Sequence, residues 1–184
     1  MTRIVAGTLG GRTLLVPPRG TRPTSERVRE AVFSRLEHLG AVDGAHVLDL
    51  YAGSGALALE ALSRGASSAV LVESDPTAAR VCRTNIANLD LSDRAHVVAT
   101  PVERHLPTAT PADLVFADPP YALDTLDEIL SALVDVLTPG GTVVVERPTR
   151  ATDLRWPEGL VADDDRRYGE THVWTAHRPQ PGNA

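Results

Sequence analysis

The strongest constraint on the fold is a glycine turn that links a short apolar strand to an apolar helix. Residues 47–60 have the sequence VLDLYAGSGALALE. Gly53 and Gly55 lack a Cβ, so the turn can adopt dihedrals that other residues avoid, and its backbone can approach a ligand closely. The helix that follows would direct its free N–H groups at the same ligand. This pattern predicts a site for a nucleotide-like cofactor, but it does not say which one.

Short apolar runs alternate with helix-length segments after residue 45. We expect strands at 46–51, 69–73, 95–99, 113–117 and 142–147, and helices at 55–64, 76–89, 102–106 and 124–137. This alternation predicts a doubly wound α/β fold with a mostly parallel sheet and helices on both faces. Only the turn 168–170 separates the apolar-rich segments 160–167 and 171–177, which predicts an antiparallel hairpin that ends the sheet.

The N-terminal residues form an extension outside this pattern. Two apolar-rich segments flank the glycine-rich stretch 7–11, which predicts a small β-hairpin. A helix is expected from a cap at Thr24 or Ser25 to about Leu39. Its predicted apolar stripe consists of Val28, Ala31, Val32, Leu36 and Leu39. We therefore expect a hairpin-and-helix extension, a main α/β domain and a disordered tail, at residues 1–39, 40–178 and 179–184.

The composition excludes several classes of protein. Hydrophobic residues make up 42% and charged residues 23% of the 184-residue chain, as in soluble globular proteins. No apolar run approaches the roughly 20 residues that a transmembrane helix needs, and the N-terminus lacks the apolar core of a signal peptide. The single cysteine, Cys82, precludes an internal disulfide, and no Cys/His cluster has metal-ligand spacing. We therefore expect a metal-free, cytoplasmic protein that does not interact with membranes.

The charge is unevenly distributed along the chain. Residues 1–36 contain seven arginines and two glutamates, whereas the whole chain has a net charge of −6. A basic segment on an acidic body is typical of a surface that binds a polyanion, and a solvated N-terminal arm explains it equally well.

The glycine turn alone fits two kinds of cofactor. Gly53-x-Gly55-x-x-Ala58 satisfies the dinucleotide fingerprint, and Glu73 lies at the end of the next strand, where a ribose ligand belongs. Asp49 separates the two cofactors, because its carboxylate can meet an ammonium group, which S-adenosylmethionine has and NAD lacks. The alternative role for Asp49 is to cap the loop.

A second motif, Asp118-Pro119-Pro120-Tyr121, follows the fourth expected strand at the edge where doubly wound sheets bind ligands. Asp118 and a backbone carbonyl beside the prolines can each accept one N–H of a base amine, which localises the nitrogen lone pair toward a methyl donor. The prolines fix φ and remove N–H donors, and Tyr121 can stack on a flipped base. The alternative for this motif is an ordinary loop, but together with the glycine turn it favours amino-methyl transfer from S-adenosylmethionine.

Both motifs resemble those of class I amino-methyltransferases, and the ends of the chain are similar to the bacterial RsmD family. The segments that carry the second resemblance are Arg3–Gly7, Gly11-Arg12, Arg22–Phe33 and Tyr168-Gly169-Glu170-Thr171. The resemblance covers nearly the whole chain and implies the class I methyltransferase (Rossmann-like) fold. It also implies methylation of the N2 amine of a guanine in 16S ribosomal RNA, at guanine 966 in the usual bacterial numbering. The partner would be the small ribosomal subunit or an assembly intermediate, and the enzyme would be a monomer.

The resemblance also assigns cofactor-binding roles. The methionine part of S-adenosylmethionine would be held by Asp49, Tyr51, Ala52, Gly53 and Gly55. Glu73, with Ser74 beside it, would bind the ribose hydroxyls. Thr24 would lie near the cofactor carboxylate, unless it serves only as a helix cap. Many such enzymes read the adenine with an acidic residue after the next strand, but none stands at 99–102 here, so we expect Val102 and backbone groups to take this role.

Arg12, Arg22 and Arg27 are the candidates for contacts with RNA phosphates. Other functions remain open from the sequence. The chemistry could act on an adenine N6 amine in DNA or another RNA, or on a protein glutamine, although glutamine enzymes typically have Asn at the position of Asp118. A nicotinamide-dependent oxidoreductase and a non-catalytic RNA-binding factor are the alternatives from other classes.

Overall fold

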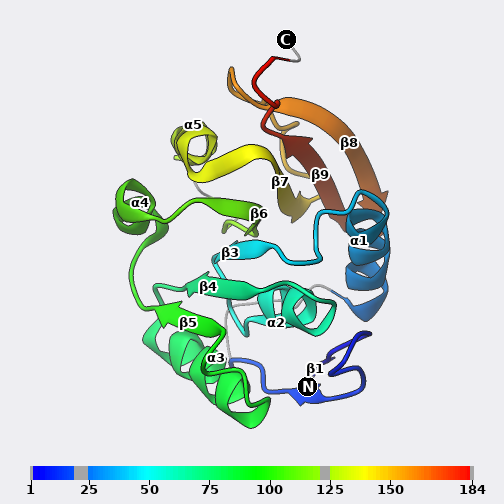
Figure 1. The fold of residues 1–184 in the computed structure, drawn as a ribbon, viewed down its shortest axis with the longest axis vertical. Helices are drawn as coiled ribbons and strands as arrows, with labels where there is room; N and C mark the ends of the chain where they lie inside the picture. The colour runs from blue at the N-terminus through cyan, green and yellow to red at the C-terminus, as the bar shows by residue number, and fades with distance from the viewer. Residues whose placement is uncertain (1, 19–24, 121–124, 183–184) are drawn as a thin grey trace.

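A seven-stranded sheet forms the centre of the computed structural model, which describes residues 2–18, 25–120 and 125–182. Its strand order is β5-β4-β3-β6-β7-β9-β8 (Figure 1). The strands are β3 (His46–Leu50), β4 (Ser68–Val72), β5 (Ala95–Val98), β6 (Ala112–Ala117), β7 (Leu137–Pro148), β8 (Val161–Tyr168) and β9 (Thr171–His177). Strands β3 to β7 pair in parallel, whereas β9 is antiparallel to both β7 and β8. The carboxyl ends of β4, β3, β6 and β7 therefore follow one another along one edge.

Helices cover both faces of this sheet. One face shares a hydrophobic cluster with α1 (Glu26–His38), α2 (Ala56–Ser63) and α3 (Pro76–Asn88). The other face shares a second cluster with α4 (Val102–His105), the short 3₁₀ helix η1 (Leu106–Thr108) and α5 (Leu126–Val136). Figure 1 shows α1 and α2 on one side of the strands and α4 and α5 on the other. The predicted doubly wound fold with a terminal antiparallel hairpin is confirmed.

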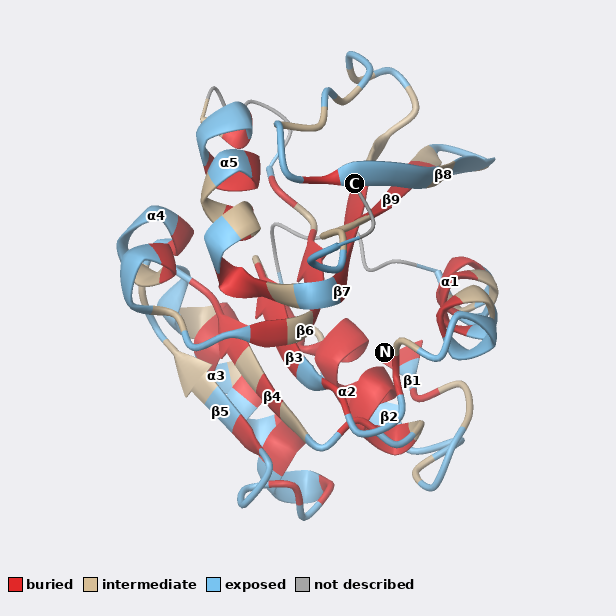
Figure 2. Ribbon diagram, turned by 45° about the horizontal axis from the view of Figure 1, so that its top comes forward, coloured by how far each residue is buried: buried red, intermediate tan, exposed pale blue. Residues whose placement is uncertain are grey.

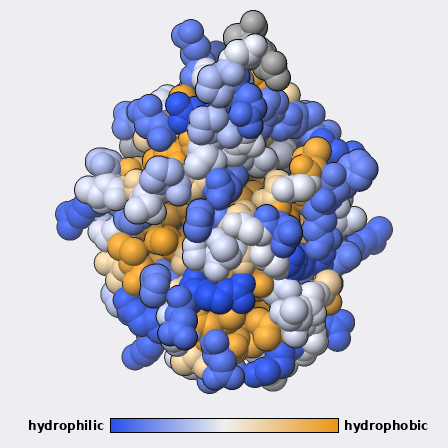
Figure 3. Space-filling view, in the orientation of Figure 1, coloured by the Kyte–Doolittle hydropathy of each residue, from blue (hydrophilic) through white to orange (hydrophobic). Residues whose placement is uncertain are grey.

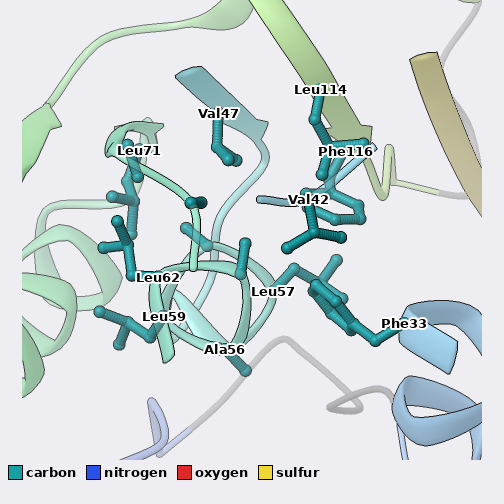
Figure 4. Close-up of a cluster of buried hydrophobic side chains, with 14 of the residues drawn as sticks. Phe33, Val42, Val47, Ala56, Leu57, Leu59, Leu62, Leu71, Leu114 and Phe116 are labelled. Atoms are coloured by element: carbon teal, nitrogen blue, oxygen red, sulfur yellow. The ribbon is translucent and has the colours of Figure 1, made fainter. Parts of the chain in front are cut away.

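Helix α2 is buried along its whole length (Figure 2). In Figure 4 Leu57 lies toward Phe33 of α1, whereas Leu59 and Leu62 lie on the other side of the helix, toward Leu71 of β4. The ring centroids of Phe33 and Phe116 are 5.5 Å apart, which links α1 to β6 directly. A helix that is covered on every side needs apolar residues all round, and this explains the composition of residues 56–63.

The N-terminal hairpin covers the face of α2 that the sheet leaves open. Its two short strands, β1 (Thr2–Arg3) and β2 (Thr13–Leu14), are antiparallel, as the sequence predicted. The turn between them docks on Ser63, whose carbonyl accepts from Thr8 N at 2.8 Å and whose hydroxyl accepts from Leu9 N at 2.9 Å. Gly7 has φ +80°, and a Cβ there would lie 2.0 Å from the Ser63 carbonyl oxygen. The hairpin can therefore approach α2 this closely only with glycine at position 7.

A buried charge network joins the N-terminal hairpin to α1 and α2. Glu60 of α2 is fully buried and accepts from the backbone N–H groups of Val5 at 2.7 Å and Ala6 at 3.0 Å. Its carboxylate also lies 3.6 Å from the fully buried guanidinium of Arg29 and 2.8 Å from that of Arg64. Buried carboxylates are stable only when paired and hydrogen-bonded, and Glu60 satisfies both conditions.

The predicted stripe of α1 was partly wrong. Leu39 is 49% exposed and Ala31 is only half-buried, whereas Phe33 and Arg29 are fully buried. The helix contacts two surfaces rather than one, because Phe33 faces the sheet and Arg29 faces the hairpin. A single apolar stripe therefore could not describe its burial.

The longest helices in the described part of the chain, α1 and α3, have 13 residues each. None of the helices in these ranges is long and apolar enough to span a bilayer. Figure 3 shows hydrophilic side chains over much of the visible face, with separate hydrophobic patches between them.

Candidate active site

The glycine turn between β3 and α2 has the strained geometry that the sequence predicted. Gly55 precedes α2 with φ +79°, and a Cβ there would lie 2.7 Å from Leu71 Cδ2. Gly53 and Tyr51 also have positive φ angles, of 59° and 61°. A positive φ is unusual for a tyrosine, and such backbone is concentrated at functional sites.

Asp49 lies beneath this turn and is only 2% exposed. Its Oδ2 accepts from Ala58 N at 3.1 Å, so it caps the first turn of α2. Burial raises the pKa of Asp49 to about 7; the Ala58 N–H opposes this change, and the charges of Asp118 and Glu73 add to it. The capping role considered for Asp49 is thus present, and the carboxylate also faces two other acidic groups.

Glu73 connects the glycine turn to the loop after β4. Its Oε2 accepts from Gly53 N at 2.8 Å, and its Oε1 accepts from Asp75 N at 2.8 Å. Asp75 itself caps α3 by accepting from Ala78 N at 2.7 Å. Glu73 therefore fixes the distance between the two loops that the resemblance assigns to the cofactor. Ser74, directly after it, is exposed.

Asp118 follows β6 at the same edge of the sheet. Its backbone N–H lies 3.5 Å from the carbonyl of Leu50, the last residue of β3. Burial raises the pKa of the Asp118 carboxyl to about 6. Pro119 is buried and Pro120 is exposed, so the chain reaches the surface after Pro119.

The structure thus brings Asp118 and Glu73, each at the end of a strand next to β3, close enough to Asp49 for both charges to raise its pKa. A cationic ligand placed among them would offset their repulsion and favour their ionised forms. An uncharged or anionic ligand would not offset this repulsion. The electrostatics of this edge therefore fit a cation.

The region expected to bind the adenine has an apolar residue, Val102, where the rest of the candidate site has carboxylates. Val102 is 3% exposed and belongs to the hydrophobic cluster on the α4 face. Burial raises the pKa of Tyr51, and the negative charge of the exposed Glu103 raises it further by a smaller amount. The buried Tyr51 hydroxyl has no hydrogen-bond partner among the residues that the structure describes. Tyr51 is thus an available polar group beside Glu103, a proximity that the sequence did not predict.

Two residues of α3 support the glycine turn and were not predicted as site residues. The thiol of Cys82 donates to the Gly53 carbonyl at 3.1 Å, and burial raises the pKa of this thiol. Asn85, 1% exposed, donates to the Ser54 carbonyl at 2.9 Å and exchanges two hydrogen bonds of 2.9 Å with the backbone of Leu15. A buried asparagine in an amphipathic helix was the available signal, because buried polar groups need partners.

The N-terminal arginines do not form one exposed surface. Arg29 is buried against Glu60, Arg3 pairs with Glu26 at 2.9 Å, and Arg35 lies 3.3 Å from a carboxylate of β8. Arg12 donates to the carbonyl of residue 88 at 2.7 Å, at the end of α3. Several of the seven charges counted in the sequence thus have partners within the protein.

Arg27 is exposed in the first turn of α1 and stays a candidate for RNA contact, as does Arg12. Thr24, Arg22 and Tyr121 lie outside the described residues, so their predicted roles are untested.

Comparison with known proteins assigns the family. The model described as "Conserved hypothetical protein 95" matches residues 2–177. The Bacillus subtilis protein YlbH is 34% identical over 179 residues, which cover 93% of this chain and 96% of that protein. The Escherichia coli "Ribosomal RNA small subunit methyltransferase D" is 40% identical over 134 residues, 72% of this chain and 67% of that protein. The chain belongs to the RsmD family of methyltransferases.

A solved structure of this family agrees with the geometry. Escherichia coli yhhF is 35% identical and superposes with a TM-score of 0.84, covering 97% of this chain and 98% of that one. The resemblance to the RsmD family and the class I methyltransferase fold are therefore confirmed.

Proposed function

We propose that this RsmD-family protein transfers a methyl group from S-adenosylmethionine to the N2 amine of a guanine in 16S ribosomal RNA, at guanine 966 in the usual bacterial numbering. The observation that carries the proposal is the position of Asp118. Its desolvated carboxylate lies in the loop after β6, beside the acidic and glycine-rich turn that follows β3. The name of the Escherichia coli relative supports RNA of the small subunit as the substrate class.

The acidic edge fits the methyl donor. When bound, S-adenosylmethionine supplies a methyl group on a positively charged sulfonium, and it also carries an ammonium group. Asp49 would face the ammonium, and Glu73 would accept from the ribose hydroxyls in addition to the Gly53 N–H. Ala52, Gly53 and Gly55 would allow close approach of the backbone, with Ser74 and Val102 at the borders of the site.

Asp118 would act on the acceptor base. Its carboxylate accepts one N–H of the guanine amine, and a carbonyl of the Asp118-Pro119-Pro120 segment accepts the other. This orientation directs the nitrogen lone pair at the methyl group, and catalysis comes from positioning and electrostatics. Tyr121 is proposed to stack on the flipped base.

Methyl transfer tests the proposal directly. Protein and labelled S-adenosylmethionine are incubated with naked 16S RNA, with partly assembled small subunits and with duplex DNA, and the labelled nucleotide is identified by mass spectrometry. We expect N2-methylguanine at one position of the RNA in the particles. Label only in DNA, or on an adenine, would refute the proposal and favour the adenine-N6 alternative.

The variant Asp118→Ala tests the mechanism. We expect at least about a hundredfold loss of turnover, as for removal of a group that acts only in the transition state, with little change in cofactor affinity measured by calorimetry. Asp113→Ala is not a suitable control, because the Asp113 side chain accepts from His46 N and Thr138 Oγ1. Asp135→Ala, an exposed change on α5, should leave both quantities unchanged. Undiminished turnover of Asp118→Ala would remove this residue from the mechanism.

Calorimetry with S-adenosylmethionine and with NAD separates the proposed methyltransferase from the oxidoreductase alternative, because only the oxidoreductase requires tight binding of NAD. Sedimentation analysis tests the proposed monomeric state. A soluble, cytoplasmic location is proposed from the same substrate class, because ribosomal particles are assembled there.

A further inference from the structure

A polar groove of about 480 Å³ lies beyond the catalytic loop, at the end of β7. It is lined by Leu126, Asp127, Arg147, Thr152, Asp153, Leu154 and Arg155. Its size falls within the range of roughly 300–1,000 Å³ that is usual for ligand sites. Neither the glycine turn nor Asp118 contributes to its walls, so it is distinct from the proposed cofactor site.

The register of the sheet places one wall of this groove, at Arg147, at the same edge as Asp118. Val145 of β7 pairs with Ala117 of β6, the residue directly before Asp118. Val143 and Val145 face the α5 cluster, and Arg147 follows them on the same side of the strand. The loops after β4, β3 and β6 therefore carry the cofactor and catalytic residues, and the groove is the next position along the same edge.

This order argues for a polymeric substrate. A strand of RNA that presents one nucleotide to Asp118 must continue along the edge, and on the side away from the cofactor turn it meets the groove. The occupant expected there is an unpaired nucleotide near the target. Sequence-specific recognition of RNA usually acts on unpaired nucleotides of this kind.

The side chains of the groove suit a base edge better than a phosphate. Arg147 and Arg155 share it with two carboxylates, Asp127 and Asp153. A carboxylate repels a phosphate but accepts from the N–H groups of a base, while arginine donates to acceptors such as guanine O6 and N7. Leu126 and Leu154 add apolar surface on which a base can rest.

The groove is also prepared for a ligand. Arg147 Nη1 donates to the Thr152 carbonyl at 3.1 Å, which fixes the strand end to the loop that forms the opposite wall. Arg155 and Asp153 are exposed, and their side chains have no hydrogen-bond or ion-pair partner within the described ranges. These two groups therefore remain available for contact.

We infer that this groove, through Arg155 and Asp153, binds the base of an unpaired nucleotide adjacent to the methylated guanine. This inference rests on the proposed function, because it takes RNA as the substrate. It assigns target selection partly to residues 147–155, in addition to the N-terminal arginines.

The test compares Arg155→Ala with Arg80→Ala, a matched change at an exposed arginine of α3. Methyl transfer to small subunits is measured for both variants, with KM and kcat determined separately. We expect Arg155→Ala to raise KM for the particle about tenfold, in line with the loss of one base contact. The kcat and the cofactor affinity should remain unchanged. Arg80→Ala should stay within about twofold of the wild type.

A second comparison separates a base from a phosphate. A set of particles is prepared, each with a single abasic site at a different nucleotide near the target. Each is assayed with the wild type and with Arg155→Ala. We expect one abasic position to raise the wild-type KM by a similar factor and to have no further effect on Arg155→Ala. In addition, Asp153→Asn, which replaces an acceptor by a group that also donates, should change the base preferred at that position.

Each remaining result would overturn the inference. An Arg155→Ala enzyme with wild-type kinetics would show that the groove does not contact RNA. Additive effects of the variant and every abasic site, together with a weaker salt dependence of binding, would show a phosphate contact instead. A wild-type enzyme that methylates no RNA would refute the proposed function itself, and the inference with it, whereas the first two results leave that function intact.

Discussion

Replacing Asp49 by Asn should stabilise the protein and at the same time weaken its cofactor binding. The buried carboxylate has a pKa of about 7, compared with its ordinary value of 3.8. In an unfolded chain the group ionises near the lower value, so at neutral pH folding must either bury a charge or take up a proton. Asn has nearly the same shape, accepts from the Ala58 N–H through its oxygen and carries no charge.

The size of the effect follows from linkage. Each pKa unit corresponds to roughly 1.4 kcal/mol, so the difference between the two states amounts to about 4 kcal/mol at most, when Asp49 is fully ionised in both. Because the pKa is raised in the folded protein, the favourable contribution of the protonated group is present at low pH and is lost as pH rises toward 7. We therefore expect the stability advantage of Asp49→Asn over the wild type to be about 2 kcal/mol larger at pH 8 than at pH 5.5.

Urea denaturation of both proteins at pH 5.5 and pH 8 measures this difference. Asp135→Asn, an exposed change on α5, is the control and should alter stability by less than about 0.5 kcal/mol at both pH values. A variant that is less stable than the wild type at pH 8, or an advantage that does not change with pH, would refute the electrostatic argument. Calorimetry on the same samples should show weaker binding of S-adenosylmethionine, since the proposed contact with its ammonium group is gone.

Two further changes test how the N-terminal hairpin is held. Glu60→Gln should cost about 3–5 kcal/mol in urea denaturation, because it leaves the buried Arg29 without its charged partner, whereas Glu30→Gln at a half-exposed pair should cost less than about 1 kcal/mol. Equal losses of stability in Glu60→Gln and Glu30→Gln would contradict the proposed importance of the buried network. Gly7→Ala should destabilise by about 2 kcal/mol or more, because its Cβ would lie 2.0 Å from a backbone carbonyl of α2; at Gly11, where φ is +84° and nothing lies within 4 Å, alanine should cost only about 1 kcal/mol. A Gly7→Ala protein as stable as Gly11→Ala would show that the hairpin does not contact α2 this closely.

The fold could be predicted because its signals are local. Apolar runs of strand length alternate with helical segments, and Ser25, one of the two predicted caps, does cap α1. Strand β7 was predicted to begin at residue 142, but it begins at Leu137, which pairs with Ala112 before an irregularity in the ladder. The sequence predicted a turn at Pro139-Gly140-Gly141. The residues before that turn are part of the strand because they pair with β6, and such pairing cannot be read from the local sequence.

The sequence predicted which residues meet at one edge of the sheet only where they lie in recognisable motifs. The glycine turn, Asp49, Glu73 and Asp118 do come together at one edge of the sheet. Asn85 was missed because its partners, Leu15 and Ser54, are distant in sequence.

Glu60 was missed for the same reason. Its position in a run of alanines and leucines gave no indication of which cations it meets. The basic character of the N-terminal segment was also overestimated, since charge counting cannot show that Arg29 is buried.

The hairpin contacts have a consequence for the order in which the chain folds. The partners of the Val5, Leu9 and Leu15 backbone and of the Arg12 side chain lie 54 to 76 residues later in the sequence. At a synthesis rate of about 5–20 residues per second, they leave the ribosome roughly 3–15 s after the hairpin itself. During this interval Gly7 and its neighbours have no surface to dock on, so the contact order of this segment is high. We therefore expect the hairpin, which is synthesised before these partners, to be among the last segments to acquire hydrogen-exchange protection.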